Sequence, residues 1–163
     1  MSKTRVYVPS TLTRLRETVV SGGLGPLPVI GHAVTEALQT AYPEGGDEEW
    51  EYAAMTAAAQ DSLGLLREDD IQARVVVVVD ADTVLPLEPA EHTLVELGEV
   101  VTVRAIAAVH VDDEVAAPDV TAARLAWSRA GAGDPDAAEA VDRCLDHELG
   151  WFAAQEIGSL IEA

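Results

Sequence analysis

The chain has 163 residues, 48% of them hydrophobic, and its 29 acidic against 10 basic residues give a formal charge of −19. A chain of this length and composition can bury a core without disulfides or metal ions, so one globular domain over residues 1–163 is expected. The charge argues against a protein that binds nucleic-acid phosphates or an anionic membrane surface. Cys144 is the only cysteine, which excludes an intrachain disulfide and a cysteine-rich zinc site.

The first residues of the chain carry no visible targeting signal. Residues 1–9 lack the apolar stretch of a signal peptide. The longest aliphatic run, residues 75–79, is far too short to cross a bilayer. The expected location is therefore the cytoplasm.

The first part of the chain predicts two strands with a helix between them. Residues 5–9 are rich in β-branched and aromatic side chains and stop at a proline, which is typical of a short strand. Ser10 or Thr11 then caps a helix that ends at Gly22. Residues 28–34 form the second expected strand. The order strand, helix, strand favours a parallel pair with a right-handed crossover.

Two helices and a buried strand are expected next. Thr35 caps a short helix that reaches Tyr42, and Asp47 caps a longer one with acidic residues in its first turn. Residues 73–79 are mostly valine, which predicts a central strand buried on both faces. One face of the longer helix is expected to lie in the core, and it consists of Tyr52, Met55, Thr56, Ala59, Leu63 and Leu66.

The second half of the chain predicts a loop at residues 85–91, an edge strand at 93–97 and a further strand at 107–112. Residues 118–130 predict a helix, and a last helix is expected from residue 135 to about residue 160. The whole is expected to be a single α/β domain, with a mixed sheet of four or five strands and helices packed on it.

Basic residues concentrate at the start of the chain. Residues 1–43 hold four basic and two acidic side chains, whereas the rest holds six basic and 27 acidic ones. Arg14 and Arg16 lie off the apolar stripe of the first helix, so both are expected on its exposed face. This surface is a candidate docking site for a protein partner.

Five segments carry a resemblance to a known family: residues 5–9, 32–35, 48–53, 107–113 and 147–156. Through them nearly the whole chain resembles a family of small, uncharacterised actinobacterial proteins, a domain of unknown function. The resemblance implies a single cytosolic domain. It implies no activity, cofactor or catalytic residue, so the functional argument depends on the residues themselves.

The last expected helix places polar side chains on an apolar face. On a helix through residues 135–160, Glu148 and Gln155 fall among Val141 and Leu145. A lone buried carboxylate costs several kcal/mol, so Glu148 must be paired, protonated or beside a water-filled pocket.

Two interpretations of Glu148 follow. In the structural one, Glu148 pairs with Arg74 or Arg104 and only attaches the helix to the sheet. In the functional one, it belongs to a pocket for a polar ligand, and the candidate ligand-binding residues are Glu148, His147, Trp151, Gln155 and His110. Cys144 falls in the apolar stripe and is expected to be an inert buried thiol.

A second constellation is acidic. Valine-rich residues 75–79 run into Asp80 and Asp82, and the strand at 107–112 runs into Asp112 and Asp113. The pattern resembles haloacid-dehalogenase-type phosphohydrolases, which implies Asp80 as nucleophile, Asp82 as general acid and Asp112 or Asp113 as Mg²⁺ ligands.

Two features speak against this hydrolase hypothesis. That family needs a lysine between the motifs, and this chain has none after Lys3. Few residues separate the motifs, which leaves little room for the intervening strand–helix units. A shared Mg²⁺ or Mn²⁺ would also require all four carboxylates to converge within about 8 Å.

The absence of a convincing catalytic set favours a non-catalytic cytosolic protein that binds a protein partner or a small ligand, with no cofactor expected. Two alternatives remain open. One is a Mg²⁺-dependent, phosphohydrolase-like enzyme that uses the strand-end aspartates. The other is an acidic mimic of nucleic acid that occupies a basic protein.

Overall fold

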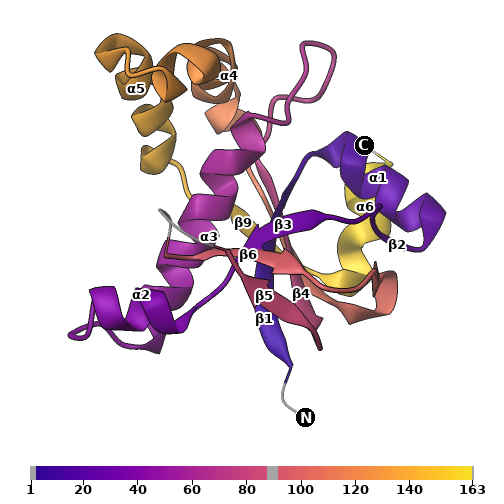
Figure 1. The fold of residues 1–163 in the computed structure, drawn as a ribbon. Coiled ribbons are helices and arrows are strands. Elements are labelled where there is room, and N and C mark those ends of the chain that lie inside the picture. Colours follow the sequence, from indigo (N-terminus) through magenta and orange to yellow (C-terminus); the bar gives the residue numbers. More distant parts are fainter. Residues whose placement is uncertain (1–2, 88–91, 163) are drawn as a thin grey trace.

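A computed structural model describes residues 3–87 and 92–162 of the chain. Among these residues, seven strands form one sheet in the order β5-β6-β3-β1-β4-β8-β9 (Figure 1). The strands are β1 Thr4–Ser10, β3 Val29–His32, β4 Val75–Ala81, β5 Val84–Pro86, β6 Leu94–Leu97, β8 Ile106–Val111 and β9 Gly150–Ala153. A separate two-stranded ribbon pairs β2, Gly23–Leu24, with β7, Val101–Thr102.

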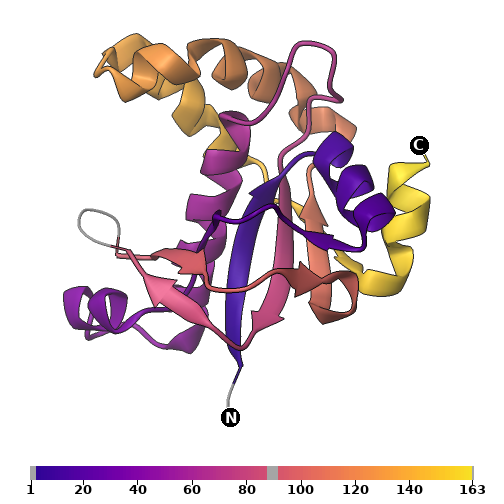
Figure 2. The same cartoon turned by 45° about the vertical axis from the view of Figure 1, so that its right-hand side comes forward.

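Helices cover both faces of the seven-stranded sheet. They are α1 Leu12–Ser21, α2 Glu36–Ala41, α3 Asp47–Leu63, α4 Ala117–Gly131, α5 Pro135–Asp142 and α6 Ile157–Ile161. The long α3 lies on one face, and α1 and α6 lie together on the other (Figure 2). Helices α4 and α5 pack against each other beyond the carboxyl end of α3 (Figure 1).

The valine run of β4 is buried on both faces, as the sequence predicts. Val75, Val77 and Val79 enter the core beneath α1 and α6, whereas Val76 and Val78 pack against α3. This division follows from the two-residue period of a strand, which sends successive side chains to opposite faces. A continuous valine run therefore fits a strand that lies between two helical layers.

The sheet is larger than expected and has no parallel pair among the described residues. Every strand pair in it is antiparallel, including β1 with β3, where Tyr7 lies opposite His32. The predicted parallel crossover is therefore wrong. The order of elements along a chain does not by itself set strand direction, because the connecting loop decides which end of the sheet the chain re-enters.

Two further expectations need correction on the β5 side. The strand expected at the edge, β6, lies between β3 and β5. The expected loop at 85–91 contributes part of β5, since Val84, Leu85 and Pro86 pair with β6. Residues 88–91 of that loop lie outside the described residues. A short strand that ends in a proline, Pro86, fits an edge position, where a missing backbone donor does little harm.

The helix ends confirm several of the predicted capping residues. Thr11 and Thr35 accept from the backbone N–H groups of Arg14 and Leu38, and α1 ends at Gly22 with φ of 88°. The predicted cap of α3 is off by one position, because α3 begins after Gly46.

The outer face of α1 is exposed, as predicted. Arg14 and Arg16 both lie on the surface, and the Arg16 guanidinium donates to the carbonyl oxygen of Ile161 in α6. Among the described residues, no helix combines the length and hydrophobicity that crossing a membrane requires.

The expected last helix does not exist as one element. Helix α5 ends at Asp142, a 3-10 turn spans Arg143–Asp146, and β9 then pairs with β8 before α6 begins. Gly150 disfavours a continuous helix, and the strand pairing with β8 decides the conformation of the residues that follow. The helical positions assigned to Glu148 and Gln155 are therefore wrong.

Candidate functional site

A groove beside β9 collects most of the predicted ligand-binding residues. This β9 groove has a volume of about 320 Å³. Its lining residues are Tyr52, Met55, Thr56, Ala59, Arg74, His110, Leu145, His147, Glu148, Leu149 and Trp151. Four of the five predicted residues are thus together, His110, His147, Glu148 and Trp151. The fifth, Gln155, is exposed in the 3-10 turn after β9 and does not line the groove.

Strand pairing brings the distant part of the chain into the groove. His110 in β8 lies directly opposite Trp151 in β9, so the two side chains stand on the same face of the sheet. Helix α3 forms the facing wall with Tyr52 and Met55. Trp151 is 61% exposed and Tyr52 57% exposed, so both aromatic rings stand open to solvent.

The groove explains an error in the predicted core face of α3. Tyr52 was expected in the core and instead is exposed at the groove. The residues of α3 that pack on the sheet are smaller, chiefly Ala54, Ala58 and Ala59. Alanines allow α3 to lie close to the valine strands, and the larger side chains border the groove.

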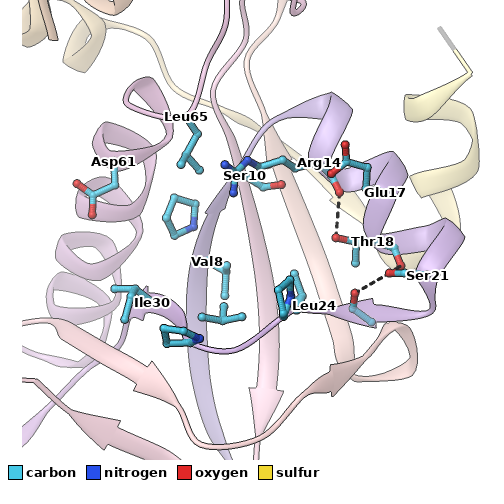
Figure 3. A pocket seen from close by; sticks show the side chains of 16 residues that line it. Val8, Ser10, Arg14, Glu17, Thr18, Ser21, Leu24, Ile30, Asp61 and Leu65 are labelled. Carbon is cyan, nitrogen blue, oxygen red and sulfur yellow. Dashed lines mark hydrogen bonds between the residues drawn. The ribbon is translucent and has the colours of Figure 1, made fainter. Parts of the chain in front are cut away.

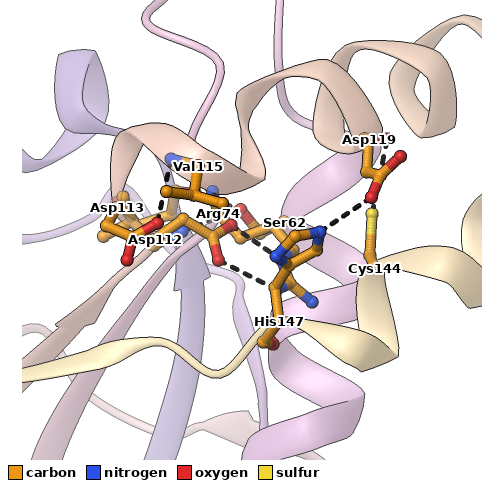
Figure 4. A network of polar contacts seen from close by, with 10 residues as sticks. Ser62, Arg74, Asp112, Asp113, Val115, Asp119, Cys144 and His147 are labelled. Carbon is orange, nitrogen blue, oxygen red and sulfur yellow. Dashed lines mark hydrogen bonds and ion pairs between the residues drawn. The ribbon is translucent and has the colours of Figure 1, made fainter.

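A buried ion pair joins Arg74, which lines the β9 groove, to Asp112 (Figure 4). Arg74 donates from Nε to Asp112 Oδ2 at 2.8 Å and from Nη2 to Oδ1 at 2.9 Å. The two side chains are 2% and 0% exposed. The backbone N–H of Arg74 also donates to Asp112 Oδ2, at 2.9 Å. A bidentate pair with this extra hydrogen bond is the geometry that compensates for burying two charges.

The ion pair also holds the segment that forms one wall of the groove. Arg74 Nη2 donates to the carbonyl oxygen of His147 at 3.0 Å. The His147 ring nitrogen Nε2 lies 2.7 Å from Asp119 Oδ2 in α4 (Figure 4). His147 is thereby fixed at both its backbone and its ring, and its neighbour Glu148 is held at the rim.

Glu148 itself is exposed, which contradicts the expected burial. Neither of its proposed partners binds it, because Arg74 pairs with Asp112, and Arg104 makes no ion pair within the described residues. Among the described residues, no hydrogen bond or ion pair involves the Glu148 carboxylate. The structural interpretation, in which Glu148 attaches a helix to the sheet, is therefore wrong. The functional interpretation loses the buried, helical Glu148 on which it also depended, so a ligand-binding role for Glu148 stays a prediction.

Burial shifts the pKa values of His110, which lines the groove, and of Cys144. It lowers the pKa of His110 below the usual value, so the imidazole is neutral at pH 7. It raises the pKa of the Cys144 thiol to about 11. Cys144 is fully buried, and its Sγ lies 3.5 Å from the carbonyl oxygen of Asp119. This fits the inert thiol expected from the sequence.

The strand-end aspartates do not converge. Strands β4 and β8 are antiparallel, so Asp80 and Asp82 lie at one end of the pair, and Asp112 and Asp113 at the other. Strand β4 has seven residues, which separates the two ends by roughly 20 Å at about 3.3 Å per residue. Carboxylates this far apart cannot share one ion with bonds of about 2.0–2.6 Å.

Each end has another use for these carboxylates. Asp80 pairs with Arg5, Asp112 pairs with Arg74, and Asp113 accepts from the backbone N–H of Val115. Within residues 3–87 and 92–162, no group of three or more His, Cys, Asp or Glu side chains could hold a metal ion.

A larger cleft was not anticipated from the sequence. Strands β1 and β3 are joined only at Tyr7 and His32, whereas β1 pairs with β4 along its whole length. Beyond that bridge lies a cleft of about 580 Å³, with Arg14 and Glu17 on α1 and Asp61 on α3 around it (Figure 3). The sequence contains no spacing that indicates this cleft, because it depends on where two strands diverge.

A buried histidine fixes the bridge between β1 and β3. His32 is fully buried, with Nδ1 2.8 Å from Thr93 Oγ1 and Nε2 2.6 Å from Asp61 Oδ2. These contacts hold β3 to α3 and to the residue before β6. His32 therefore satisfies its own polar atoms inside the protein and is not free to bind a ligand.

A comparison with known families assigns the chain but no activity. Residues 4–161 match a family of unknown function (DUF6912). The chain belongs to this family. No curated protein and no solved structure matches the chain. The family supplies no catalytic or binding residue, so the groove and its chemistry are the available guide to function.

Proposed function

We propose that the protein is a non-catalytic binding domain, and that the β9 groove is the binding site for a small molecule. The observation that supports this most directly is the gathering of His110, His147, Glu148 and Trp151 in one groove, from segments that are distant along the chain. A volume of about 320 Å³ lies at the lower end of the range found for small-molecule pockets, about 300–1,000 Å³.

Binding fits the groove better than covalent catalysis does. The hydroxyl groups that line it belong to Tyr52 and Thr56. In the described residues, neither hydroxyl is hydrogen-bonded to a histidine or a carboxylate, so the nucleophile and base of a covalent mechanism are not paired. The ion pair beneath the groove fixes its shape, which favours tight binding because a preformed site needs little ordering.

The experiment is a fragment screen observed by NMR on uniformly ¹⁵N-labelled protein. The chain has three tryptophans, and each gives one indole N–H signal. We expect hits to move the indole signal of Trp151, which the Trp151→Phe variant identifies by its loss. The same hits should bind Trp151→Phe more weakly.

Trp50 provides the matched control. Its indole Nε1 donates to the carbonyl oxygen of Tyr42 at 3.0 Å, away from the groove. Trp50→Phe should therefore leave the affinity of each hit unchanged. A library with no hits, or hits that bind wild type and Trp151→Phe equally well, would overturn the proposed function.

A further inference from the structure

The base of the β9 groove presents a hydrogen-bond donor. Arg74 uses Nε and Nη2 for Asp112 and for the His147 carbonyl, and Nη1 makes no hydrogen bond to the described residues. The side chain is 98% buried. Among the described residues, Gln60 Oε1 is the one fully buried side-chain polar atom without a hydrogen-bond partner. Arg74 Nη1, which also has no partner, therefore keeps some contact with solvent. Arg74 thus lines the groove with two Nη1 N–H groups that no described residue accepts from, which is the donor that the inference below assigns to a ligand acceptor.

The charge around this donor disfavours an anion as that acceptor. The bidentate contact with Asp112 neutralises the Arg74 guanidinium. Glu148 adds a negative charge at the rim, and the chain as a whole carries −19. An anionic ligand would therefore meet net repulsion on approach and at the rim. A carbonyl oxygen or a ring nitrogen satisfies Arg74 without that penalty.

Two further groups of the groove are free to accept from a ligand. His110 is half-buried and makes no side-chain hydrogen bond within the described residues. As a neutral imidazole it offers one donor and one acceptor nitrogen. The Glu148 carboxylate at the rim offers acceptors only. A ligand N–H group can therefore be bound in the same groove as an acceptor for Arg74.

The walls of the groove fit a flat ring. Trp151 and Tyr52 present exposed aromatic rings, and Met55 adds a polarisable thioether. The volume of about 320 Å³ is ample for one ring system of nucleobase size. The phosphate charge of a nucleotide or a dinucleotide cofactor would be disfavoured beside Glu148 in so acidic a chain.

From this arrangement we infer that the ligand is a neutral, planar nitrogen heterocycle of nucleobase size, with a carbonyl or ring-nitrogen acceptor for Arg74 and an N–H donor for His110 or Glu148. The inference rests on the proposed function and goes beyond it, because a binding groove could equally take an acid or an aliphatic amine. Its test therefore compares ligands that share one ring and differ in charge.

Two probe pairs make this comparison. Nicotinamide is neutral and nicotinate is its anionic counterpart, and hypoxanthine is largely neutral at pH 7 whereas urate is an anion. We expect the neutral member of at least one pair to move the Trp151 indole signal and to bind about tenfold more tightly than its anion. A tenfold ratio corresponds to a difference of roughly 1.4 kcal/mol in binding free energy. The Trp50→Phe control should preserve that ratio.

Two variants test the assigned contacts. Glu148→Gln removes the rim charge from an exposed side chain without hydrogen bonds to lose, so the preference for the neutral probe should shrink about threefold or more. His110→Leu should weaken the neutral probe about threefold to tenfold, the effect of one hydrogen bond. Circular dichroism confirms that each variant is folded before titration.

The outcomes separate this inference from the proposed function. Tighter binding of the anions, or fragment hits at Trp151 that are all acids or aliphatic amines, would overturn the heterocycle inference and leave the binding groove intact. A preference for the neutral probe that Glu148→Gln and His110→Leu both leave unchanged would overturn the assigned contacts. No binding by any probe or fragment would overturn both proposals.

Discussion

Two arginine–aspartate pairs brace the opposite ends of β4, and they differ mainly in their exposure to water. At one end the Arg5 Nε lies 3.2 Å from Asp80 Oδ1, with side chains 53% and 37% exposed. At the other end the Arg74 and Asp112 side chains are 2% and 0% exposed. The same two residue types thus join β4 to its neighbours in two dielectric environments. Their energetic roles differ accordingly.

The buried pair has consequences that the exposed pair does not have. Removing two charges from water costs several kcal/mol per ion, so the Arg74–Asp112 contact is tolerable only with good geometry and further hydrogen bonds. It has both, including the bond from Arg74 Nη2 to the His147 carbonyl. The buried pair therefore fixes one wall of the β9 groove. The exposed pair at Arg5 and Asp80 lies at the other end of the strand and fixes no site.

The largest expected effect comes from breaking the buried pair. Asp112→Ala leaves the Arg74 guanidinium buried without its counterion, which should lower the free energy of unfolding by about 3–5 kcal/mol. Urea unfolding followed by circular dichroism measures this. A loss below about 1 kcal/mol would show that water reaches Arg74 and that the pair resembles the exposed one.

A double variant sharpens the same comparison. Arg74→Met with Asp112→Leu replaces both charges with apolar side chains of similar size, and such replacements are often neutral or stabilising. We expect the double variant to be more stable than Asp112→Ala, and to have a less ordered β9 groove because the His147 carbonyl loses its donor. Hydrogen exchange of the amides in residues 147–152 reports that loosening.

The second effect concerns the thiol next to the buried pair. Burial raises the pKa of Cys144 to about 11, from a reference value of 9.0. At pH 8 the thiolate fraction should therefore be about a hundredfold below that of a free cysteine. Iodoacetamide should modify Cys144 very slowly in native protein and rapidly in urea, with mass spectrometry as the readout. Rapid modification of the native protein would show that this region is open.

The sequence predicts those elements whose signal is local. The valine run of β4 predicts a strand buried on both faces, and the structure has one. Thr11 and Thr35 likewise cap the helices that follow them. The sequence does not predict β9, because its apolar spacing also fits a helix. Only pairing with β8, some forty residues earlier in the chain, decides the outcome.

The site follows the same division. His147, Glu148 and Trp151 are close along the chain and line one groove although the predicted helix does not exist, and their role in binding a ligand stays a prediction. Strand pairing then adds His110, which no local pattern places beside Trp151. The sequence predicts Arg74 as an ion-pair partner but assigns it to Glu148, because the contact with Asp112 spans 38 residues and many acids compete as partners in so acidic a chain.

The third effect is a pH dependence at the groove. Burial lowers the pKa of His110 in the folded state, so the folded protein binds fewer protons than the unfolded chain near that pKa. The stability this provides is complete above about pH 6.5, the unfolded value, and is lost as the pH falls through the folded pKa. His110→Gln should therefore lose less stability than wild type between pH 7 and pH 5. Equal losses in urea titrations at the two pH values would show that His110 is solvated like the groups at the Arg5 end.

The smallest expected effect belongs to the exposed pair. Asp80→Ala should lower the free energy of unfolding by only about 0.5 kcal/mol, because water screens both charges and two mobile side chains lose entropy when they pair. That difference should vanish in about 1 M NaCl, where the screening length is about 3 Å, whereas the effect of Asp112→Ala should persist. Urea unfolding of both variants at low and high salt tests the contrast directly. A salt-independent loss of several kcal/mol for Asp80→Ala would show that the exposed pair stabilises the fold as strongly as the buried one. Burial would then not explain why only the Arg74–Asp112 pair fixes a wall of the groove.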